Sequence, residues 1–444
     1  MSLNSFCTGH RHHSQRGAAT LVVVMLLFFV MTLTAAYTAR NLIFEQRTSA
    51  NLYRSTQSFE AAEAGLEWAI ARLNSGRLNA ACAPTTDVAF DTFRQRYLNI
   101  NPATGAVFRV VRAPFAAPDP PSFRWAACAF DGTDWVCDCP TNALPVPSTV
   151  TTAAGPYPAF AVRFANQTAR PGLTRIEVNG CNSADPACLF NFRPEAEEGV
   201  VCRSTVCSLV AMRSALEFPP LSAATAYDAI VANEATVSVV NEDVVSGGWT
   251  LRSRDAIQRT PGPLLRSSPG TPGIASLLED DSALDELLPE VDDCVRCMAT
   301  ATFNLSPDTY RQQPAVLEIN CAVACSGAEV STARVGHPQR PVVLVGAGGL
   351  SLTGATDSIG TVLDPVLLRV DGPVSITGDA TVIGLLYARG AALSAGTVQG
   401  AIISAAGLTL SGTATVLYDP AILNTLQRAR GSFVRLPGGW RDIP

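Results

Sequence analysis

The first part of the chain contains hydrophobic residues that run without interruption and then recur at helical spacing. No charged residue occurs between Arg16 and Arg40, and residues 21–31 are all apolar. As a helix, the uncharged run of residues 17–39 would span about 34 Å, which is enough to cross the hydrocarbon core of a membrane. Because no proline interrupts residues 41–73, we predict one continuous helix from about residue 18 to about residue 75, where Asn74-Ser75-Gly76 supplies the stop signal.

The second half of this predicted helix is amphipathic. Leu52, Phe59, Leu66 and Leu73 recur every seven residues, and Ile70 lies four positions after Leu66. Charged residues occupy the remaining faces, so the apolar residues form one packing stripe. The stripe could pack against the globular part of this chain or against similar helices of other subunits, and the pattern leaves both possibilities open.

Residues before the apolar run carry positive charge only. Arg11 and Arg16 precede the run with three histidines and no acid, which predicts that this flank stays in the cytoplasm and that the rest lies outside. A cleaved secretory signal is the alternative, but its apolar region is usually about 7–15 residues long and is followed by a cleavage site rather than by more helix. We therefore predict a single membrane-spanning helix.

The middle of the chain has the pattern of short strands and turns. Residues 107–111 and 160–164 alternate in hydrophobicity, and Asp131–Gly132 is a typical turn sequence, so we predict a β-rich head. Proline and glycine then mark a linker after residue 260. Residues 276–279, Ser-Leu-Leu-Glu, predict a capping box that opens an acidic helix.

A loose repeat occupies the carboxy-terminal part. Four strings that alternate apolar and small residues end at Gly354, Gly378, Gly396 and Gly412, which lie 24, 18 and 16 residues apart. One such short strand cannot bury its inner face alone, whereas stacked copies form a continuous core. We predict a small parallel β-solenoid, with a β-sandwich as the alternative, and an α+β protein as a whole.

Twelve cysteines follow the apolar run, and an even number outside the cytoplasm indicates disulfides. The disulfide candidates are Cys82, Cys128, Cys137, Cys139, Cys181, Cys188, Cys202, Cys207, Cys294, Cys297, Cys321 and Cys325. The short spacings of Cys181 to Cys188 and of Cys202 to Cys207 suit local loops, but the sequence does not give the pairing. The last four cysteines also have a spacing that a structural zinc site accepts, which remains the alternative.

Charge and residue chemistry argue against several functions. The net charge is −6, so the chain has no overall electrostatic reason to bind nucleic acid. His337 is the one histidine after the apolar run, and its place before a proline predicts an exposed loop residue rather than a base. The acids of the repeat region, Asp357, Asp364, Asp371 and Asp379, are expected to form turns. We predict no catalytic residue, no metal site and no cofactor.

Two parts of the chain resemble a known family. Residues 15–22, Gln-Arg-Gly-Ala-Ala-Thr-Leu-Val, the apolar run and residues 59–67, Phe-Glu-Ala-Ala-Glu-Ala-Gly-Leu-Glu, resemble the amino terminus of the PilX family of type IV pilus assembly proteins. Residues 383–387, 400–403 and 417–423 resemble the β-repeat tail of many PilX-like proteins. The central region resembles nothing that we can name.

The resemblance implies a processing step and a set of partners. A prepilin peptidase would cut between Gly17 and Ala18, and the new amino terminus at Ala18 would be methylated. The mature protein would move from the bacterial inner membrane, with its carboxy terminus outside the cytoplasm, to the pilus or cell surface. Its partners would be other minor pilins and the major pilin.

One position departs from the pattern of most pilins. They carry a glutamate five residues after the cut, and Val22 occupies that position here. A carboxylate inside a membrane needs a partner, which in a filament is the amino terminus of the subunit ahead. Val22 has no such requirement, so we predict a place at or near the filament tip. An apolar residue is also simply more stable in lipid, which suits a rare accessory subunit.

These features divide the chain into seven segments. They are a leader (1–17), a transmembrane helix (18–39), its amphipathic extension (40–76), a β-rich head (77–260), a linker with the acidic helix and paired cysteines (261–341), solenoid-like repeats (342–420) and a tail (421–444). We predict a minor pilin that primes pilus assembly and contributes to adhesion or motility. The alternatives are a K-type tip pseudopilin of type II secretion and an anchored envelope solenoid that binds or cleaves glycan.

Overall fold

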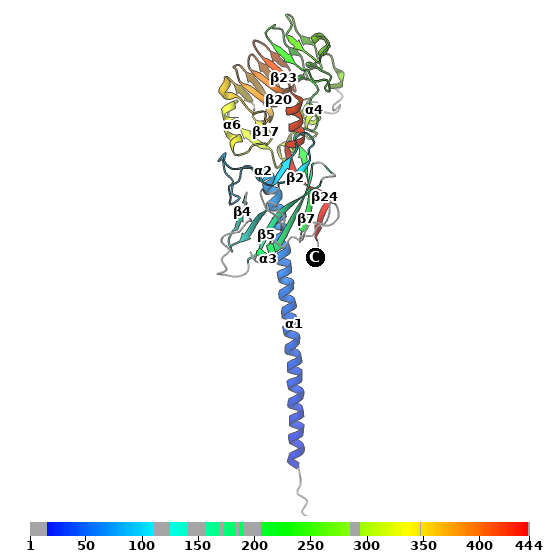
Figure 1. Cartoon of the computed structure of the whole chain (residues 1–444), viewed down its shortest axis with the longest axis vertical. Helices are drawn as coiled ribbons and strands as arrows, with labels where there is room; N and C mark the ends of the chain where they lie inside the picture. Colours follow the sequence, from blue (N-terminus) through cyan, green and yellow to red (C-terminus); the bar gives the residue numbers. More distant parts are fainter. Residues whose placement is uncertain are drawn as a thin grey trace, which may run out of the picture. The chain divides into compact units, whose positions relative to one another are not determined.

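The long amino-terminal helix is the first element of the structure. The computed structural model describes residues 16–110, 125–140, 157–167, 170, 172–182, 186–189, 206–284, 294–346 and 348–442. Helix α1 runs from Arg16 to Leu73 without a break and is blue in Figure 1. The predicted continuous helix is therefore confirmed. The chain divides into two units between Gln57 and Ser58, so α1 contributes residues to both.

Hydroxyl groups inside the apolar part of α1 bond to the helix itself. The side chains of Thr32, Thr34 and Thr38 donate to backbone carbonyl oxygens four residues earlier, at distances of 2.9, 2.9 and 2.7 Å. A hydroxyl in lipid needs such a partner because water is absent there. These threonines are therefore compatible with a helix that crosses a membrane.

The head is an antiparallel sheet that packs on the end of α1. Its strand order is β24-β7-β6-β5-β3-β4. The strands are β3 (Ala126–Phe130), β4 (Trp135–Asp138), β5 (Ala159–Asn166), β6 (Leu173–Cys181), β7 (Val206–Ser214) and β24 (Gly431–Asp442). Smaller elements complete the head: α2 (Phe93–Tyr97), α3 (Pro186–Leu189), and the antiparallel pair β1 (Leu98–Ile100) and β2 (Val107–Arg109).

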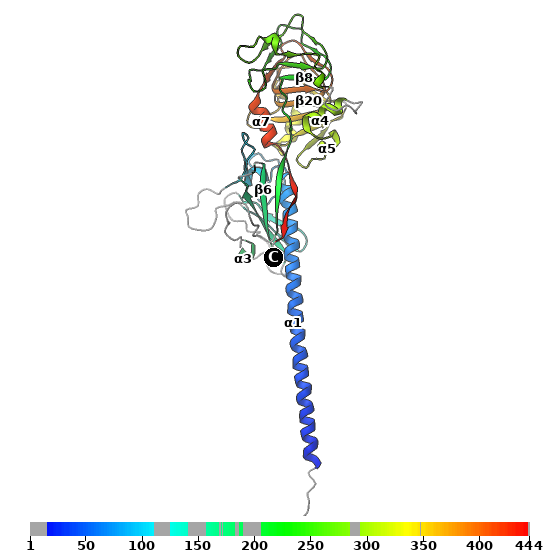
Figure 2. The same cartoon turned by 90° about the vertical axis from the view of Figure 1, so that its right-hand side faces the viewer.

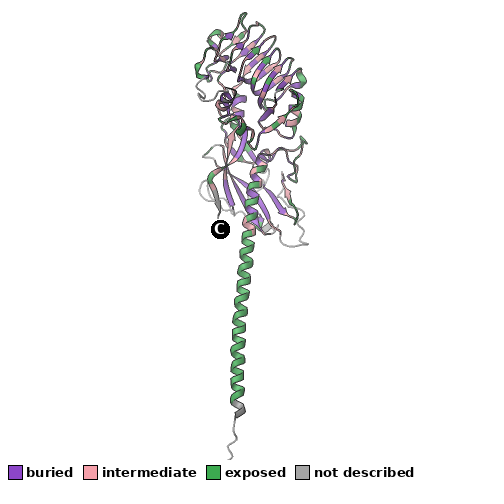
Figure 3. Cartoon of the chain, turned by 180° about the vertical axis from the view of Figure 1, so that it is seen from behind, coloured by how far each residue is buried: buried purple, intermediate pink, exposed green. Residues whose placement is uncertain are grey.

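A glycine brings α1 close to this sheet. A Cβ atom at Gly65 would lie 2.7 Å from the side chains of Phe160 and Val178, closer than carbon atoms pack. Leu66, Ala69 and the aromatic ring of Phe160 are all buried in the same core. Figure 3 shows α1 exposed along its first part and buried where the sheet covers it.

The remaining strands form one parallel sheet that coils into a solenoid, visible as the stack of strands in Figures 1 and 2. Its strands are β8 (Ala224–Ala226), β9 (Ile230–Val231), β10 (Ser238–Val240), β11 (Leu251–Ser253), β12 (Ile257–Gln258), β13 (Leu264–Arg266), β14 (Leu277–Leu278), β15 (Leu317–Asn320), β16 (Cys325–Ser326), β17 (Val342–Val345), β18 (Leu350–Leu352), β19 (Val366–Ile376), β20 (Thr381–Leu393), β21 (Thr397–Ser404), β22 (Leu408–Leu410) and β23 (Thr415–Tyr418). Every pairing between these strands is parallel. The solenoid prediction is confirmed over the β-sandwich alternative.

The order of the coils differs from the order of the chain. Along one face the ladder reads β15-β17-β19-β20-β21-β8-β11-β14. The earliest strands of the solenoid therefore stack on its latest ones, because Ile402–Ser404 pair with Ala224–Ala226. The parallel sheet thus extends beyond the predicted 342–420 into segments that the sequence assigns to the head and linker.

Strand length explains why those early coils are not visible in the sequence. Strands β9, β12 and β14 have two residues each, which is too short for an alternating pattern to stand out. The early coils nevertheless supply Ile230, Leu251 and Ile257 to the same buried core as the later coils. They join the stack by backbone pairing rather than by a repeated motif.

Helices cover one outer face of the coils. They are α4 (Cys294–Phe303), α5 (Pro307–Arg311) and α7 (Pro420–Ala429), while α6 (Gly327–Val335) lies against β16 and β18. Three buried side chains of α7, those of Ile422, Leu423 and Leu426, pack with Leu385 and Tyr387 of β20 in one cluster. The helices thus bury a second apolar face of the solenoid, outside its central core.

The predicted capping box at Ser276 is wrong. Ser276 ends the 3-10 turn η1 (Gly273–Ser276), and Leu277–Leu278 form β14, which pairs with β11. Further 3-10 turns are η2 (Ser282–Leu284) and η3 (Ala355–Asp357). The Ser276 hydroxyl lies 2.7 Å from the Thr250 hydroxyl of the neighbouring coil. This segment therefore pairs with the neighbouring coil instead of forming the helix that its local sequence predicts. Residues 285–293 of the expected acidic helix lie outside the described residues.

The solenoid is an insertion in the head sheet. Strand β7 ends at Ser214, β24 begins at Gly431, and these two residues are paired across the antiparallel ladder. All solenoid strands lie between them in the sequence. The chain therefore leaves the head at one point, builds the coils, and returns to the same point to complete the head sheet.

Candidate assembly helix and its head

The apolar side chains of residues 21–31 in α1 are exposed. Leu21, Val22 and Phe28 are 61, 55 and 66% exposed. By length and composition, α1 is the one described helix that could cross a membrane. Gly17 and Ala18, the residues on either side of the expected cut, lie in its first turn. The helix therefore presents an apolar surface that needs lipid or other helices.

The packing stripe divides between the head and the exposed helix. Leu66 and Leu73 are fully buried in the head core, and Phe59 and Ile70 pack partly buried against it. Leu52 is 68% exposed. The later part of the stripe thus belongs to the fold of this chain, while Leu52 remains available for a different contact.

Aromatic rings fix the end of α1 against the head. The Trp68 ring lies 5.4 Å from that of Phe93 in an edge-to-face arrangement and 5.6 Å from that of Phe160. The Arg72 guanidinium also lies against the indole, 5.6 Å from its centroid. Such contacts add to the stabilisation from buried area, so the last turns of the helix are firmly packed on the sheet.

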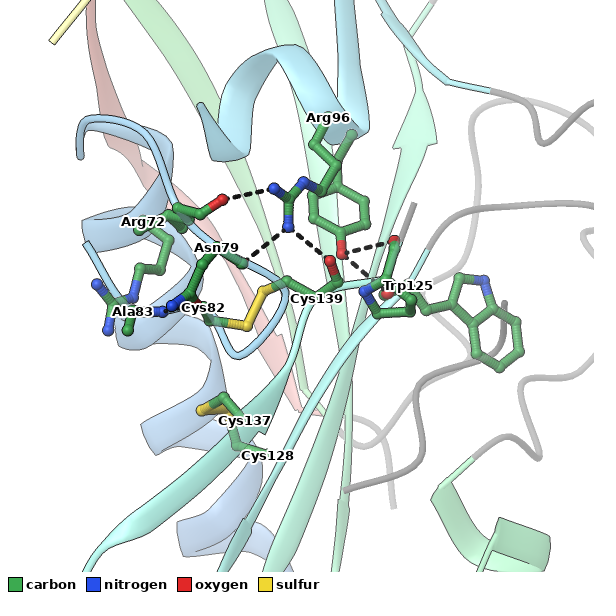
Figure 4. The surroundings of a disulfide bond; sticks show 12 residues. Arg72, Asn79, Cys82, Ala83, Arg96, Trp125, Cys128, Cys137 and Cys139 are labelled. Atoms are coloured by element: carbon green, nitrogen blue, oxygen red, sulfur yellow. Dashed lines mark hydrogen bonds between the residues drawn. A yellow bond between two sulfur atoms is a disulfide. The ribbon is translucent and has the colours of Figure 1, made fainter. Parts of the chain in front are cut away.

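A buried arginine and a disulfide hold the segment that follows α1 (Figure 4). The Arg96 guanidinium of α2 donates to the carbonyl oxygens of Leu78, Asn79 and Cys139. The Cys82–Cys139 disulfide joins the same two segments covalently. Hydrogen bonds to carbonyl oxygens and a disulfide therefore both hold the segment after α1 close to the segment that contains Cys139.

Comparison with known proteins identifies the helical segment. Residues 16–67 match the PilX N-terminal family. The long helix therefore has the amino-terminal sequence of a PilX-like type IV pilin. The match covers most of α1, including its first contacts with the head, and confirms the amino-terminal part of the resemblance stated from the sequence. The carboxy-terminal part of that resemblance lies outside the matched residues.

The other comparisons add little to this assignment. A crystal structure of the competence-associated pilin ComZ from Thermus thermophilus is similar at 11% sequence identity, covering 88% of this chain and 97% of that chain with a TM-score of 0.22. No curated protein matches the chain.

Most candidate cysteines lie in disulfides. The structure pairs Cys82 with Cys139, Cys128 with Cys137, Cys181 with Cys188, and Cys321 with Cys325. Cys207 is also disulfide-bonded, whereas Cys202 lies outside the described residues. Cys297 is buried in α4, and the side chain of Cys294 is not described.

The zinc alternative does not fit these pairings. A zinc site needs cysteine thiolates, and the sulfur atoms of Cys321 and Cys325 are joined to each other instead. No cluster of three or more metal-binding side chains occurs among the residues that the structure describes.

The acids of the solenoid have structural partners. Asp357 accepts hydrogen bonds from the backbone and hydroxyl of Thr353 at 2.9 and 3.0 Å, and these bonds lower the pKa of its carboxyl. Asp371 pairs with Arg369 at 2.6 Å. Turn formation was expected for both. Asp357 matches that expectation because it ends the 3-10 turn η3, whereas the expectation is wrong for Asp371, which lies inside strand β19.

His337 is half-buried rather than exposed, so that prediction is wrong. Its Nδ1 lies 3.0 Å from Nη1 of Arg340, and because a guanidinium only donates, Nδ1 is the acceptor. A Cβ atom at Gly76 would clash with the same ring. Burial and the Arg340 charge lower the pKa of His337. The residue is part of the contact between the end of α1 and the solenoid.

Asn74 has a structural role that sequence reasoning does not detect, because the sequence assigns it only to the end of the helix. Its amide nitrogen donates to the carbonyl oxygen of Phe433 at 2.9 Å, and its amide oxygen accepts from the Phe433 backbone nitrogen at 2.8 Å. Asn74 thus pairs with β24 as a strand would. An asparagine after a helix is common, so the sequence has no signal for this long-range pairing.

Proposed function

We propose that the protein is a minor pilin of the type IV pilus that is made as a membrane-inserted precursor. In this proposal prepilin peptidase removes residues 1–17, Ala18 is methylated, and α1 then leaves the lipid of the inner membrane for a bundle of pilin helices. The observation that carries the proposal is the exposed apolar surface of α1, a helix whose last turns belong to the core of the head.

The physical basis is the exchange of one apolar environment for another. Residues 21–31 are apolar and exposed, and each buried side chain of this kind contributes roughly 1.5–3 kcal/mol relative to water. The helix is thus stable in lipid or among other helices, but not in water. Assembly needs only partners whose helices offer a comparable surface, namely the major pilin and other minor pilins.

We further propose that the subunit lies at or near the pilus tip, where it primes assembly and displays the solenoid for adhesion or motility. Val22 supports this position because it requires no amino-terminal partner from a subunit ahead. The insertion between Ser214 and Gly431 supports it as well, since a subunit enlarged by a whole solenoid fits most easily where no further subunit must follow.

The same valine favours a second candidate, the K-type tip pseudopilin of type II secretion. The two candidates share the apolar helix and differ in the filament that they join. Recovery of the protein with sheared pili supports the first, whereas a secretion defect in a deletion strain with normal pili supports the second.

Mass spectrometry of the mature amino terminus tests the processing step. We expect methylated Ala18 as the first residue in both membrane and sheared-filament fractions. Gly17→Leu should retain the leader and disappear from the filament fraction, while Gly9→Ala, inside the leader, serves as the matched control and should be processed normally. Filament-associated protein that keeps residues 1–17 would contradict the proposal.

A substitution at Val22 tests the tip position separately. Val22→Glu restores the carboxylate that pairs with a subunit ahead, and we expect the variant to appear along the filament in immunogold labelling instead of at its end. Val22→Ile is the apolar control. If both variants keep the wild-type distribution, residue 22 does not determine the position.

A further inference from the structure

A cavity of about 280 Å³ lies between the head and the solenoid insertion. The head side is formed by α2 and β1, and the solenoid side by Gln339 and by the last residues of α7 and its exit. Among the described residues that line it, Arg94 and Arg430 are charged and none is a carboxylate. A cavity of this size with an exclusively cationic charge is suited to a small anion.

Arg94 is held in place before any ligand arrives. It is 6% exposed, its Nε and Nη2 donate to the Leu73 carbonyl oxygen at 3.2 and 3.1 Å, and Nη2 also donates to that of Gly431 at 2.9 Å. Its guanidinium lies over the Phe433 ring, 4.8 Å from the centroid. These contacts use Nε and Nη2, and within the described residues Nη1 has no hydrogen-bond partner.

Arg430 is equally buried and more weakly bonded. It is 6% exposed, its Nη2 lies 3.4 Å from both Asp364 Oδ1 and the Leu363 carbonyl oxygen, and its Nη1 donates to the Ala429 carbonyl oxygen at 3.3 Å. Its buried Nε has no hydrogen-bond partner within the described part of the chain. A buried guanidinium group without a full set of acceptors is costly, and an oxyanion supplies acceptors in the matching fork geometry.

The surrounding charges are unbalanced. Asp364 pairs with Arg334 at 2.9 Å as well as with Arg430, while Arg340 donates to backbone carbonyl oxygens of residues 315 and 316. Burial and the positive charges of Arg430 and Arg340 lower the pKa of Arg94 to about 9. Among these described side chains Asp364 is the one carboxylate, and it pairs with both Arg334 and Arg430. A bound anion would therefore reduce the repulsion between the positive charges.

We propose that this cavity binds a small oxyanion of the phosphate or carboxylate class through Arg94 Nη1 and the Arg430 guanidinium. Arg94 belongs to α2 of the head and Arg430 directly follows α7 of the solenoid insertion, so one ligand bonds to both parts at the same time. The bound anion therefore strengthens the attachment of the solenoid to the head. This site does not depend on the proposed pilus role.

Thermal unfolding of the full chain in detergent, with inorganic phosphate as the probe, tests the site. We expect phosphate to raise the melting temperature saturably, beyond sodium chloride of equal ionic strength. Arg430→Gln should weaken the apparent phosphate affinity by about tenfold, because one charged fork is lost. Arg389→Gln, at an exposed position of the solenoid strand β20, is the matched control and should respond as the wild type does.

A second variant keeps the test decisive if Arg430→Gln fails to fold. Asn99 lies on the cavity lining at an exposed position of β1, and Asn99→Asp places a carboxylate there. We expect this variant to melt at a higher temperature without phosphate and to respond less to phosphate.

A parallel titration with acetate distinguishes the class of anion, and a saturable effect of either anion supports the site. A phosphate effect equal to that of chloride, or equal responses of wild type, Arg430→Gln and Asn99→Asp, would overturn the proposal.

Discussion

At the residue scale, two contacts depend on the chemistry of a single position, namely the missing side chain of Gly65 and the uncharged imidazole of His337. Gly65 has no Cβ atom, and this absence lets α1 approach Phe160 and Val178. His337 accepts a hydrogen bond from Arg340 only while its Nδ1 carries no proton. Both positions lie where segments far apart in the sequence meet, and each leads to a measurable prediction.

Gly65→Val should destabilise the head. The added side chain must displace the Phe160 ring or the Val178 side chain, and overpacking of this kind typically costs about 1–3 kcal/mol. We expect the free energy of unfolding to fall by about 2 kcal/mol, net of the small gain in helix propensity. Ala64→Val, at the exposed neighbouring position, is the control, and equal stability of the two variants would contradict the packing argument.

His337→Asn should make the protein less sensitive to acid. Because burial and Arg340 lower the pKa of His337 in the folded state, the unfolded chain takes up the proton first. The stabilising contribution of neutral His337 is therefore complete above the unfolded pKa of about 6.5 and is lost as the pH falls from there to the folded pKa.

The measurement compares the free energies of unfolding of wild type and His337→Asn at pH 7.5 and pH 5. Carboxylates titrate in both proteins, so they cancel in the difference. We expect the wild type to lose more stability than the variant between the two pH values. An equal loss would show that His337 keeps the same proton affinity when the protein unfolds.

At the element scale, periodic patterns are readable from the sequence and pairings over long distances are not. The predicted helix matches α1 because a long uncharged run and a seven-residue stripe are local signals. Strands β9 and β12 are not predicted because a strand of two residues is too short to show alternating hydrophobicity. Leu277–Leu278 are wrongly predicted to be helical because the local sequence does not show that they pair with β11. Asn74 is recognised as a helix end but not as the partner of Phe433.

Disulfide loops of different length give a prediction at this scale. The Cys82–Cys139 bond links residues 57 positions apart, whereas the Cys321–Cys325 bond links residues 4 positions apart. In the chain-entropy model the longer loop restricts the unfolded chain more, by about 4 kcal/mol compared with about 2 kcal/mol.

Paired serine substitutions test this difference. Replacing both Cys82 and Cys139 by serine should lower the free energy of unfolding by about twice as much as replacing both Cys321 and Cys325. Denaturant unfolding of the two double variants measures both losses. If the short loop contributes as much as the long one, loop entropy is not the main source of the stabilisation.

At the scale of the whole molecule, the protein consists of a helix, a head sheet and an inserted solenoid, and the insertion point is narrow. Ser214 of β7 and Gly431 of β24 are paired neighbours in an antiparallel ladder. Two strands at that distance are commonly joined by a two-residue turn. The head sheet therefore contains all of its own strands without the solenoid.

Excision of the solenoid tests this organisation. We replace residues 215–430 by Asn-Gly, which favours a tight hairpin turn between β7 and β24. The shortened protein should still form the Cys82–Cys139 and Cys128–Cys137 disulfides, because their cysteines and the Phe160 core all belong to the head. It should be less stable than the full chain, since contacts such as that between the Arg77 backbone nitrogen and the Gly336 carbonyl oxygen are lost.

Disulfide mapping by mass spectrometry and recovery in sheared filaments measure the two parts of this prediction separately. Native disulfides together with incorporation into pili would assign assembly to the helix and head, leaving the solenoid for display. Scrambled disulfides would mean that the head requires the insertion in order to fold. A control protein with Asn-Gly inserted between Ser214 and Ala215 of the full chain separates the effect of the turn from that of the excision.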